Sequence, residues 1–172
     1  ISLGHLRLSI LDLSSSGNQP MSSSNDRYKI VYNGEIYNFK SLKLELEKEN
    51  NIKWKSSTDT EVLLEYISKY GLENSLKKIN GMYAFGLWDK KEKKLVICRD
   101  RFGEKPLYYG WIGKDFVFCS EINPIRKIYK DNLKINKFAL SLYTQYGYVP
   151  SPYSIYDNVF KLEAGTFIEI SK

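Results

Sequence analysis

The chain has 172 residues, of which 42% are hydrophobic and 27% charged, and both its length and its composition fit one folded globular domain. No stretch approaches the roughly 18 consecutive apolar residues that a membrane span needs, so a membrane protein is excluded. The net charge of +6 suggests nucleic-acid binding, but the densest basic run, at 90–94, lies between two apolar segments, where a solvated hairpin turn explains it.

The two cysteines, Cys98 and Cys119, each lie in an apolar, strand-like run. Buried, reduced thiols explain both of them. Because there is no secretory signal and no disulfide framework, the predicted compartment is the cytoplasm. The chain opens at Ile1 without an initiator methionine, and we expect both ends to be cuts through a longer protein.

Two strands are predicted near the start of the chain. The alternation from Leu6 to Ile10 is typical of a half-buried strand and turns Arg7 away from the apolar layer. After a polar loop, residues 27–32 form a second strand, which is predicted to end at the turn dipeptide Asn33-Gly34.

Two helices follow, and the second has the clearer start. The first is predicted over about twelve residues from Asn38, with Phe39, Leu42 and Leu46 at helical spacing. Residues 58–61 match the capping-box pattern, and that helix ends near Gly71. A short helical piece is predicted at 72–79.

The second half of the chain is rich in short strands joined by short turns, which favours antiparallel neighbours. The predicted strands cover 82–88, 95–99, 107–112, 116–119 and 166–170, and a late helix covers 136–146 with Asn136 as its N-cap. Because the run at 82–88 is apolar on both faces, layers should cover both sides of its sheet. The pattern therefore predicts a layered α+β sandwich.

Four polar features lie at the edges of these elements: Arg7, the 33–35 turn, Asp59 and the loop 99–103. Each has a structural explanation by itself. Arg7 can pair with a carboxylate on an exposed face, Asn-Gly is a common hairpin signal, and Asp59 complements the helix dipole. Taken singly, none of them identifies a function.

Taken in order, the segments around these residues resemble the glutaminase domain of asparagine synthetases, a class II glutamine amidotransferase. The resemblance covers nearly the whole chain and is carried by GHLRLSILDLS at 4–14, NQPMS at 18–22, VYNGEIYNFKSLKLELE at 31–47, TDTEVLL at 58–64, INGMYAFGLWD at 79–89, CRDRFGEKPLYY at 98–109, FVFCSEI at 116–122 and YGYVPSPYSIYDNVFKLEAG at 146–165.

The resemblance implies an N-terminal-nucleophile hydrolase fold, a four-layer αββα sandwich with two antiparallel sheets between helical layers. It also implies that glutamine is hydrolysed to glutamate and ammonia. In this family the ammonia passes to a synthetase domain of the same chain, which uses ATP and magnesium to amidate aspartate or a related acceptor. No cofactor or metal is expected within residues 1–172, and the expected localisation stays cytoplasmic.

The resemblance also implies roles for individual residues. Arg7 would bind the α-carboxylate of glutamine, a task that suits its planar guanidinium, and Asp59 would bind the α-ammonium. The side-chain amide of Asn33 and the backbone N–H of Gly34 would donate to the oxyanion that forms when the carbonyl is attacked. A glycine in a tight turn would suit such close approach.

Glu35 would help to hold the glutamine, and the backbone around Ile10 and Leu11 would complete the pocket. The loop 99–103 is interpreted as a salt-bridged turn without a catalytic task. His5, the only histidine, has no set of metal-binding partners nearby in sequence and is interpreted as structural.

One part of the family pattern has no match here. The family's nucleophile is a cysteine at the processed N-terminus, whose own α-amino group acts as its base. Cys98 and Cys119 lie too far along the chain to be that residue. We therefore expect several tens of residues, opening with Met-Cys-Gly, before Ile1, and a synthetase domain after Lys172. The 172 residues alone should be inactive, and the oligomeric state, a homodimer included, is open.

Two other classes of function are kept as alternatives. A degenerate domain would bind glutamine or dock partners without hydrolysing it, and a residue other than cysteine after the initiator methionine would favour this. A nucleic-acid-binding domain would use the basic, tyrosine-rich surface, and a salt-dependent gel shift would reveal it.

Overall fold

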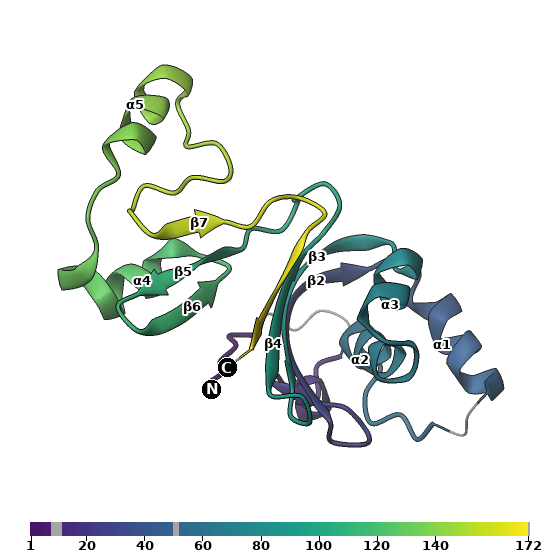
Figure 1. Cartoon of the computed structure of the whole chain (residues 1–172). Helices are drawn as coiled ribbons and strands as arrows, with labels where there is room; N and C mark the ends of the chain where they lie inside the picture. Colours follow the sequence, from purple (N-terminus) through teal and green to yellow (C-terminus); the bar gives the residue numbers. More distant parts are fainter. Residues whose placement is uncertain (8–11, 50–51, 172) are drawn as a thin grey trace. The chain divides into compact units, whose positions relative to one another are not determined.

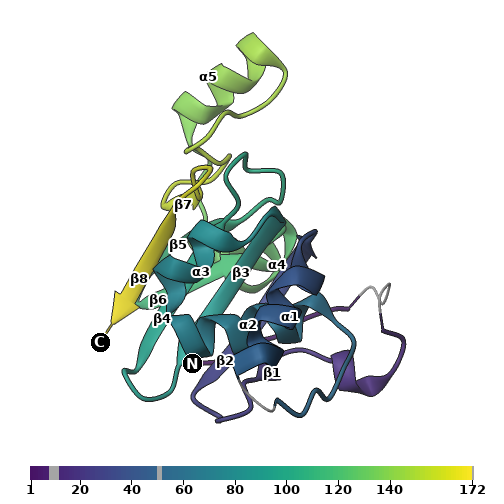
Figure 2. The ribbon, with the colours of Figure 1, turned by 90° about the vertical axis from the view of Figure 1, so that its right-hand side faces the viewer.

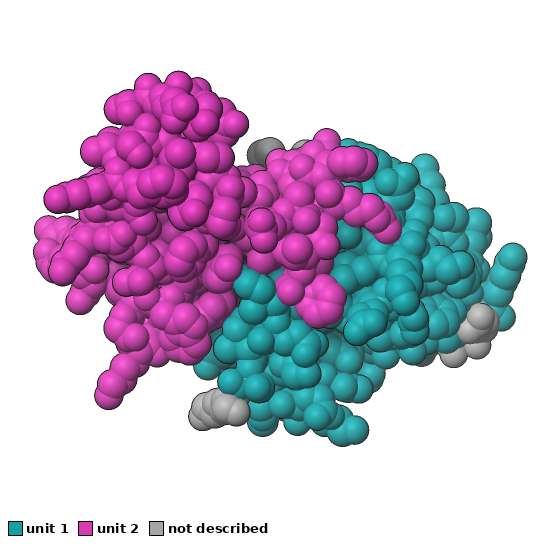
Figure 3. All heavy atoms as spheres, turned by 45° about the horizontal axis from the view of Figure 1, so that its top comes forward, with its two compact units in different colours: residues 1–97, 168–172 teal, residues 98–167 magenta. Residues whose placement is uncertain are grey.

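A computed structural model describes residues 1–7, 12–49 and 52–171 of the chain (Figure 1). It contains two compact units: unit 1, residues 1–97 with 168–172, and unit 2, residues 98–167 (Figure 3). Helices accompany two antiparallel sheets, so the predicted α+β class with two such sheets is confirmed. No helix among the described residues is long and apolar enough to cross a membrane.

Unit 1 is built on a five-stranded sheet in the order β1-β2-β3-β4-β8. Its strands are β1 (Met21–Ser22), β2 (Tyr28–Ile36), β3 (Gly81–Asp89), β4 (Lys94–Arg99) and β8 (Phe167–Ser171). β2 and β3 pair without a bulge from Tyr28↔Asp89 to Ile36↔Gly81. Since side chains alternate along a strand, Ile30, Tyr32 and Ile36 share one face, and all three are buried.

Helices cover one face of this sheet, as Figures 1 and 2 show. They are α1 (Phe39–Glu49), α2 (Asp59–Tyr70) and α3 (Leu72–Lys78), while a 3-10 turn, η1 (Ser15–Gly17), precedes β1. Leu63, Leu64 and Ile67 of α2 are fully or almost fully buried. The predicted helices of this half are confirmed, because their apolar spacing and end signals act within a few residues.

The start of α2 differs in one detail from the capping box expected there. The Thr58 side chain accepts a hydrogen bond from the backbone N–H of Glu61, as predicted. The carboxylate of Glu61, however, accepts from the backbone N–H groups of Lys55 and Ser56, at 2.9 and 2.7 Å, and from the Ser56 hydroxyl. The Thr58 N–H donates to Ser56 Oγ instead. The side chain of Glu61 thus fixes the turn before the helix.

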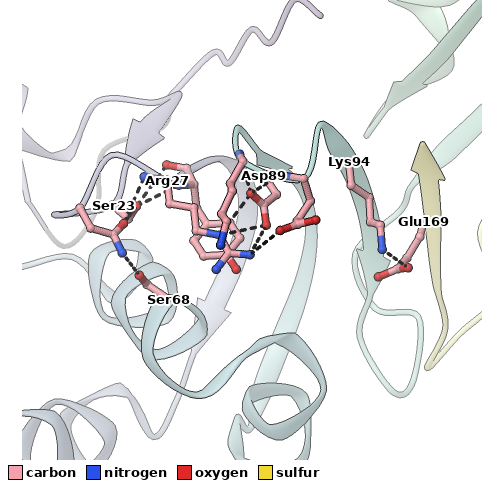
Figure 4. A network of polar contacts seen from close by, with 10 residues as sticks. Ser23, Arg27, Ser68, Asp89, Lys94 and Glu169 are labelled. Carbon is pink, nitrogen blue, oxygen red and sulfur yellow. Dashed lines mark hydrogen bonds and ion pairs between the residues drawn. The ribbon is translucent and has the colours of Figure 1, made fainter. Parts of the chain in front are cut away.

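Ion pairs fasten the strand ends of unit 1 (Figure 4). The Arg27 guanidinium donates to both carboxylate oxygens of Asp89, with a shortest distance of 2.7 Å, and Lys94 pairs with Glu169 between β4 and β8. Burial raises the pKa of Asp89, but hydrogen bonds from Arg27 and from the backbone of the 90–93 turn outweigh it and hold that pKa below its usual value. The basic run therefore forms the hairpin turn that the sequence predicts.

Unit 2 contains a three-stranded antiparallel sheet in the order β6-β5-β7. Its elements are β5 (Tyr108–Ile112), β6 (Asp115–Cys119), α4 (Ile122–Tyr129), the 3-10 turn η2 (Lys130–Asn132), α5 (Lys137–Tyr146) and β7 (Val159–Lys161). Ile112, Ile125 and Val159 form its small core. Asn136 caps α5 as predicted, since its side chain accepts from the Ala139 N–H at 2.8 Å.

One prediction near the start of the chain is wrong, and another fails for the two of its residues that the structure describes. Residues 33–35 form no turn, because β2 runs straight through them to Ile36. Residues 5–7 are not a strand, and Leu6 is fully exposed although its alternation predicted burial. Alternation produces a strand only when a partner pairs with it. The rest of that predicted strand, residues 8–10, lies outside the described residues.

Candidate functional site

The candidate site lies along an edge of β2 that the neighbouring strand leaves unpaired. β1 is only two residues long and pairs with Ile30 and Lys29 of β2. Beyond Ile30, side chains take the place of a strand. Gln19 Oε1 accepts from the Tyr32 N–H at 2.6 Å, and His5 Nε2 lies 3.0 Å from the Tyr32 carbonyl oxygen. Within the described residues, β2 therefore continues past Tyr32 with an open edge.

The backbone N–H of Gly34 points out of this open edge. In an antiparallel pair the backbone groups of successive residues point alternately to the two sides of a strand. The N–H groups of Tyr32 and Ile36 point to the open side, where each donates to a side chain. The Tyr37 N–H instead donates to the carbonyl of Asn80, the residue just before β3. Because the register has no bulge, Gly34 points the same way as Tyr32 and Ile36.

Asp59 binds the next N–H group along this edge, that of Ile36. Its Oδ2 accepts from the Tyr32 hydroxyl at 2.7 Å and from the Ile36 N–H at 2.8 Å, and only 5% of the residue is exposed. Among the described residues Oδ1 has no hydrogen-bond donor. Residues two apart in a strand are about 7 Å apart, so the carboxylate that holds the Ile36 N–H lies roughly one such step along the edge from the Gly34 N–H. A carboxylate held by two donors and open on one oxygen suits a cation.

Asn33 and Glu35 project from the opposite face of β2, since the side chains of Tyr32 and Ile36 occupy the helix face. Asn33 is half-buried and Glu35 is exposed. Neither side chain has a hydrogen-bond partner in the described part of the chain. The open edge is thus flanked by Asp59 on one face and by a free amide and a free carboxylate on the other.

Arg7 is fastened to the loop before β1, and through it to the start of α2. Its guanidinium donates to the backbone carbonyls of Ser14, at 2.8 Å, and Asp12. The Asp12 carboxylate in turn accepts from the Ser57 N–H at 3.0 Å, two residues before Asp59. Hydrogen bonds from Ser57 and Ser14 hold the pKa of Asp12 far below its usual range. Arg7 is therefore placed near α2, without a direct contact to Asp59.

The close spacing between β2 and β3 requires a glycine at position 34. The sequence suggested a different reason, a tight turn. Its φ is not in the left-handed region, unlike that of Gly71 or Gly103. A Cβ added to Gly34 would lie 2.7 Å from the Cα of Tyr83 on β3 and even closer to the Met82 carbonyl oxygen. β2 and β3 can approach this closely only because position 34 has no side chain.

Three residues of the site were missed by sequence reasoning or given no part in it: Tyr32, Gln19 and His5. The carbonyl partner requires a proton on His5 Nε2, so Nδ1 is an acceptor, and it is buried without a partner among the described residues. Burial and the positive charge of Arg7 lower the pKa of His5, whereas the hydrogen bond to Tyr32 raises it. Burial is the largest of these effects, so the pKa is lowered and the ring is neutral at pH 7. This agrees with the structural role expected for His5.

Two further predictions concern the backbone around Ile10 and Leu11 and the loop 99–103. Ile10 and Leu11 lie outside the described residues. In the loop 99–103, Arg99 donates to the carbonyls of Gly103, Lys105 and Leu162, and the buried Asp100 carboxylate accepts three backbone N–H groups. These side chains fasten a turn, as expected, chiefly through backbone groups. No cluster of His, Cys, Asp and Glu suited to a metal occurs in the described ranges.

Neither cysteine has the properties of a nucleophile. Cys98 is 2% exposed, and burial raises the pKa of its thiol to about 12. Burial also raises the pKa of Cys119. Since the thiolate is the reactive form, both thiols are inert near neutral pH, and both are free, as predicted.

Comparison with known proteins decides the family. A family model described as a glutamine amidotransferase domain matches residues 1–172. The chain belongs to this glutamine amidotransferase family. The resemblance seen in the sequence is thereby confirmed, and the segments that carried it extend over both units.

Two relatives of this amidotransferase domain are synthetases by name. A Methanocaldococcus jannaschii protein provisionally named glutamine-hydrolysing asparagine synthetase 2 is 47% identical over 95% of the chain and 34% of its own length. The glutamine-hydrolysing asparagine synthetase 1 of Bacillus subtilis is 38% identical over 96% of the chain and 26% of its own length. The chain thus spans about a third or less of these relatives.

A solved structure shows a similar fold. Glutamine phosphoribosylpyrophosphate amidotransferase from B. subtilis, solved with ADP and GMP, matches with a TM-score of 0.59 and 29% identity. The match covers 69% of this amidotransferase domain and 27% of that chain. Its fold is of the N-terminal-nucleophile type expected from the sequence.

Proposed function

We propose that this chain is the glutamine-binding part of a glutaminase, which hydrolyses glutamine to glutamate and ammonia. One observation carries the proposal: the Gly34 N–H lies on the open edge of β2, with the half-satisfied carboxylate of Asp59 on one face of the strand and the free side chain of Asn33 on the other. An anion site and a cation site on one edge, about one two-residue step of a strand apart, match an amino acid whose side-chain carbonyl becomes an oxyanion.

Glutamine would lie across the open edge. Its α-ammonium would donate to Asp59 Oδ1, while its α-carboxylate would replace the carbonyls of Ser14 and Asp12 as partner of the Arg7 guanidinium. The carboxamide would then reach Gly34 and Asn33, and Glu35 would accept from the carboxamide NH₂. Discrimination against a simple amide follows, because such an amide would leave the buried charge of Asp59 unpaired.

In the reaction, a thiolate attacks the carboxamide carbon, and the carbonyl π electrons move to oxygen. The Gly34 N–H and the Asn33 Nδ2–H donate to that oxyanion, and loss of one such donor typically lowers the rate about 10²–10³-fold. Collapse breaks the C–N bond, releases ammonia after proton transfer to nitrogen, and leaves a thioester that water hydrolyses to glutamate. We assign the thiol to an N-terminal cysteine of the complete protein, because Cys98 is buried, Cys119 is half-buried, and burial raises the pKa of both thiols.

The complete protein would pass the ammonia to a synthetase segment. Two relatives named glutamine-hydrolysing asparagine synthetase, each far longer than this chain, support this assignment. ATP and magnesium would act in that segment, with aspartate as the acceptor. The free thiols accord with a reducing compartment, and we assign the reaction to the cytoplasm.

Glutamate release from glutamine by the complete protein tests this proposal. Turnover is expected, and it should be lost when the N-terminal cysteine is replaced by alanine. Replacement of Cys98 and Cys119 by serine is the matched control and should leave turnover within about two-fold. Glutamine binding without release of glutamate by the unaltered protein would refute hydrolysis and favour a degenerate binding module.

A further inference from the structure

The helix α5 in unit 2 carries an apolar stripe that is left in water. At about 100° per residue, Phe138, Ala139, Leu142, Tyr143 and Tyr146 fall within one arc of about 140°. Such an arc normally packs against a core, yet Ala139 is the only residue of α5 that is buried. Phe138, Tyr143 and Tyr146 are 55%, 52% and 55% exposed.

Few contacts hold α5 to the rest of unit 2. Figures 1 and 2 both show α5 standing away from the β6-β5-β7 sheet. The Asn136 cap and the bond from the Gly147 N–H to Tyr143 O, at 2.8 Å, are internal to the helix ends. The described polar and ring contacts with the rest of unit 2 are a hydrogen bond from the Asn136 N–H to Ile155 O, at 2.9 Å, and an edge-on contact between the rings of Phe138 and Tyr153, 5.2 Å apart. A ten-residue helix is marginal without packing. A covering partner would supply that packing.

The aromatic side chains continue past the end of the helix. Tyr148, 61% exposed, places its ring 6.4 Å from that of Tyr146. We name Phe138, Tyr143, Tyr146 and Tyr148 the α5 patch. Tyrosine and phenylalanine are enriched at protein interfaces because they bury a large area and fix few rotatable bonds. The patch therefore has the composition of an interface and none of the charge of a solvated helix face.

We propose that the α5 patch is the docking surface for the synthetase segment of the same polypeptide. The patch is too small for a stable contact between separate molecules: four aromatic side chains at these exposures offer roughly 450 Å², against about 800 Å² per partner in a standard interface. A covalent tether removes this requirement, because it gives the docking partner an effective concentration in the millimolar range.

The lengths of the relatives indicate which segment could cover the α5 patch. Residues matching this chain make up 34% of the M. jannaschii relative and 26% of the B. subtilis relative, so most of each relative lies outside the match. A contact that fixes the two parts relative to each other would serve ammonia transfer between them. This assignment rests on the proposed function, because the synthetase segment is part of that proposal.

Site-specific photo-crosslinking of the complete protein tests this surface. p-Benzoylphenylalanine at position 143, and separately at 146, should crosslink within one chain to peptides that follow Lys172. The exposed Thr144 lies about 170° around the helix from the middle of the stripe. Position 144 is therefore the matched control and should give at least five-fold less of that product.

Three outcomes would overturn the docking assignment: crosslinks to residues 1–97, a crosslinked species of twice the mass, or no crosslink at either position. The first would place unit 1 on the patch, and the second would place another copy there. Glutamate release by the same preparation is assayed separately. Crosslinking without turnover would refute the glutaminase and leave the docking surface standing.

Discussion

Replacement of Asp59 by asparagine should remove recognition of the α-ammonium and little else. Asparagine has the shape of aspartate, so its carbonyl oxygen can keep both donors of Oδ2, the Tyr32 hydroxyl at 2.7 Å and the Ile36 N–H at 2.8 Å. The change is confined to the position of Oδ1, where an acceptor becomes an NH₂ group. Removing one partner of a buried, hydrogen-bonded charge pair costs about 2–5 kcal/mol. This corresponds to a loss of roughly thirty-fold to several-thousand-fold in kcat/KM for glutamine.

Two substrates separate this effect from general damage. Glutaramate has the same carboxylate and carboxamide as glutamine but lacks the α-ammonium. The unaltered complete protein should prefer glutamine by the factor given above, and the Asp59→Asn protein should handle the two substrates within about five-fold of each other. A control is Glu65→Gln, which removes another buried carboxylate of α2, one that binds Ser24, and should preserve the preference. A glutamine preference that survives in Asp59→Asn would refute the role of Asp59.

Three further predictions concern stability. Tyr32→Phe should lower the free energy of unfolding, measured by urea titration, by about 1.5–3 kcal/mol, because it removes a buried hydrogen bond to a charged group. The control is Tyr109→Phe, which removes a hydroxyl without a described partner and should change this free energy by less than about 0.5 kcal/mol. Gly34→Ala should lower the free energy of unfolding by about 1–3 kcal/mol, because the added Cβ would clash with the backbone of β3, and it should abolish glutamate release. The control is Gly4→Ala, since Gly4 has open space around it. Equal stability of the two variants would contradict this prediction. The pKa of Asp89 is lowered, so its stabilising contribution should be complete above pH ~4 and lost as pH falls through that lowered pKa; urea midpoints measured from pH 6 to pH 2 should fall less steeply in Asp89→Asn.

Local signals account for the elements that the sequence predicted correctly. Thr58 and Asn136 begin helices by accepting backbone N–H bonds three residues ahead, and Gly71 ends one with positive φ. α4 was missed because it contains Pro124, which is tolerated only because it lies in the first turn. β7 was missed because three residues are too few for a periodic pattern.

The turn predicted at 33–34 and the strand predicted from Leu6 both depend on pairing with distant parts of the chain. The Asn-Gly pair at 33–34 has the composition of a turn. Its glycine is needed, however, because β2 and β3 lie close together at this position. That contact depends on Tyr83, the partner of Gly34 in the sheet, which is 49 positions away in the sequence. The segment from Leu6 has strand alternation, but whether a strand pairs with it is decided by tertiary structure. Local pattern contains neither kind of information.

The candidate site divides in the same way. Arg7, Asn33, Gly34, Glu35 and Asp59 came from resemblance, and the structure places Gly34 and Asp59 beside one open edge. The sequence did not indicate that Tyr32 and Gln19 belong to the site, because their positions there depend on where β1 stops pairing with β2. A short edge strand followed by isolated polar residues is the sequence signal that could have indicated them.

Glutamine binding at Gly34 is tested most directly by NMR of the complete protein, labelled with ¹⁵N-glycine and with its nucleophile replaced so that substrate persists. The Gly34 amide resonance should move saturably as L-glutamine is added, while that of Gly4 stays in place, and the movement should vanish in Asp59→Asn. A Gly34 resonance that does not move at glutamine concentrations that saturate turnover of the active protein would contradict a glutamine site at the open edge of β2.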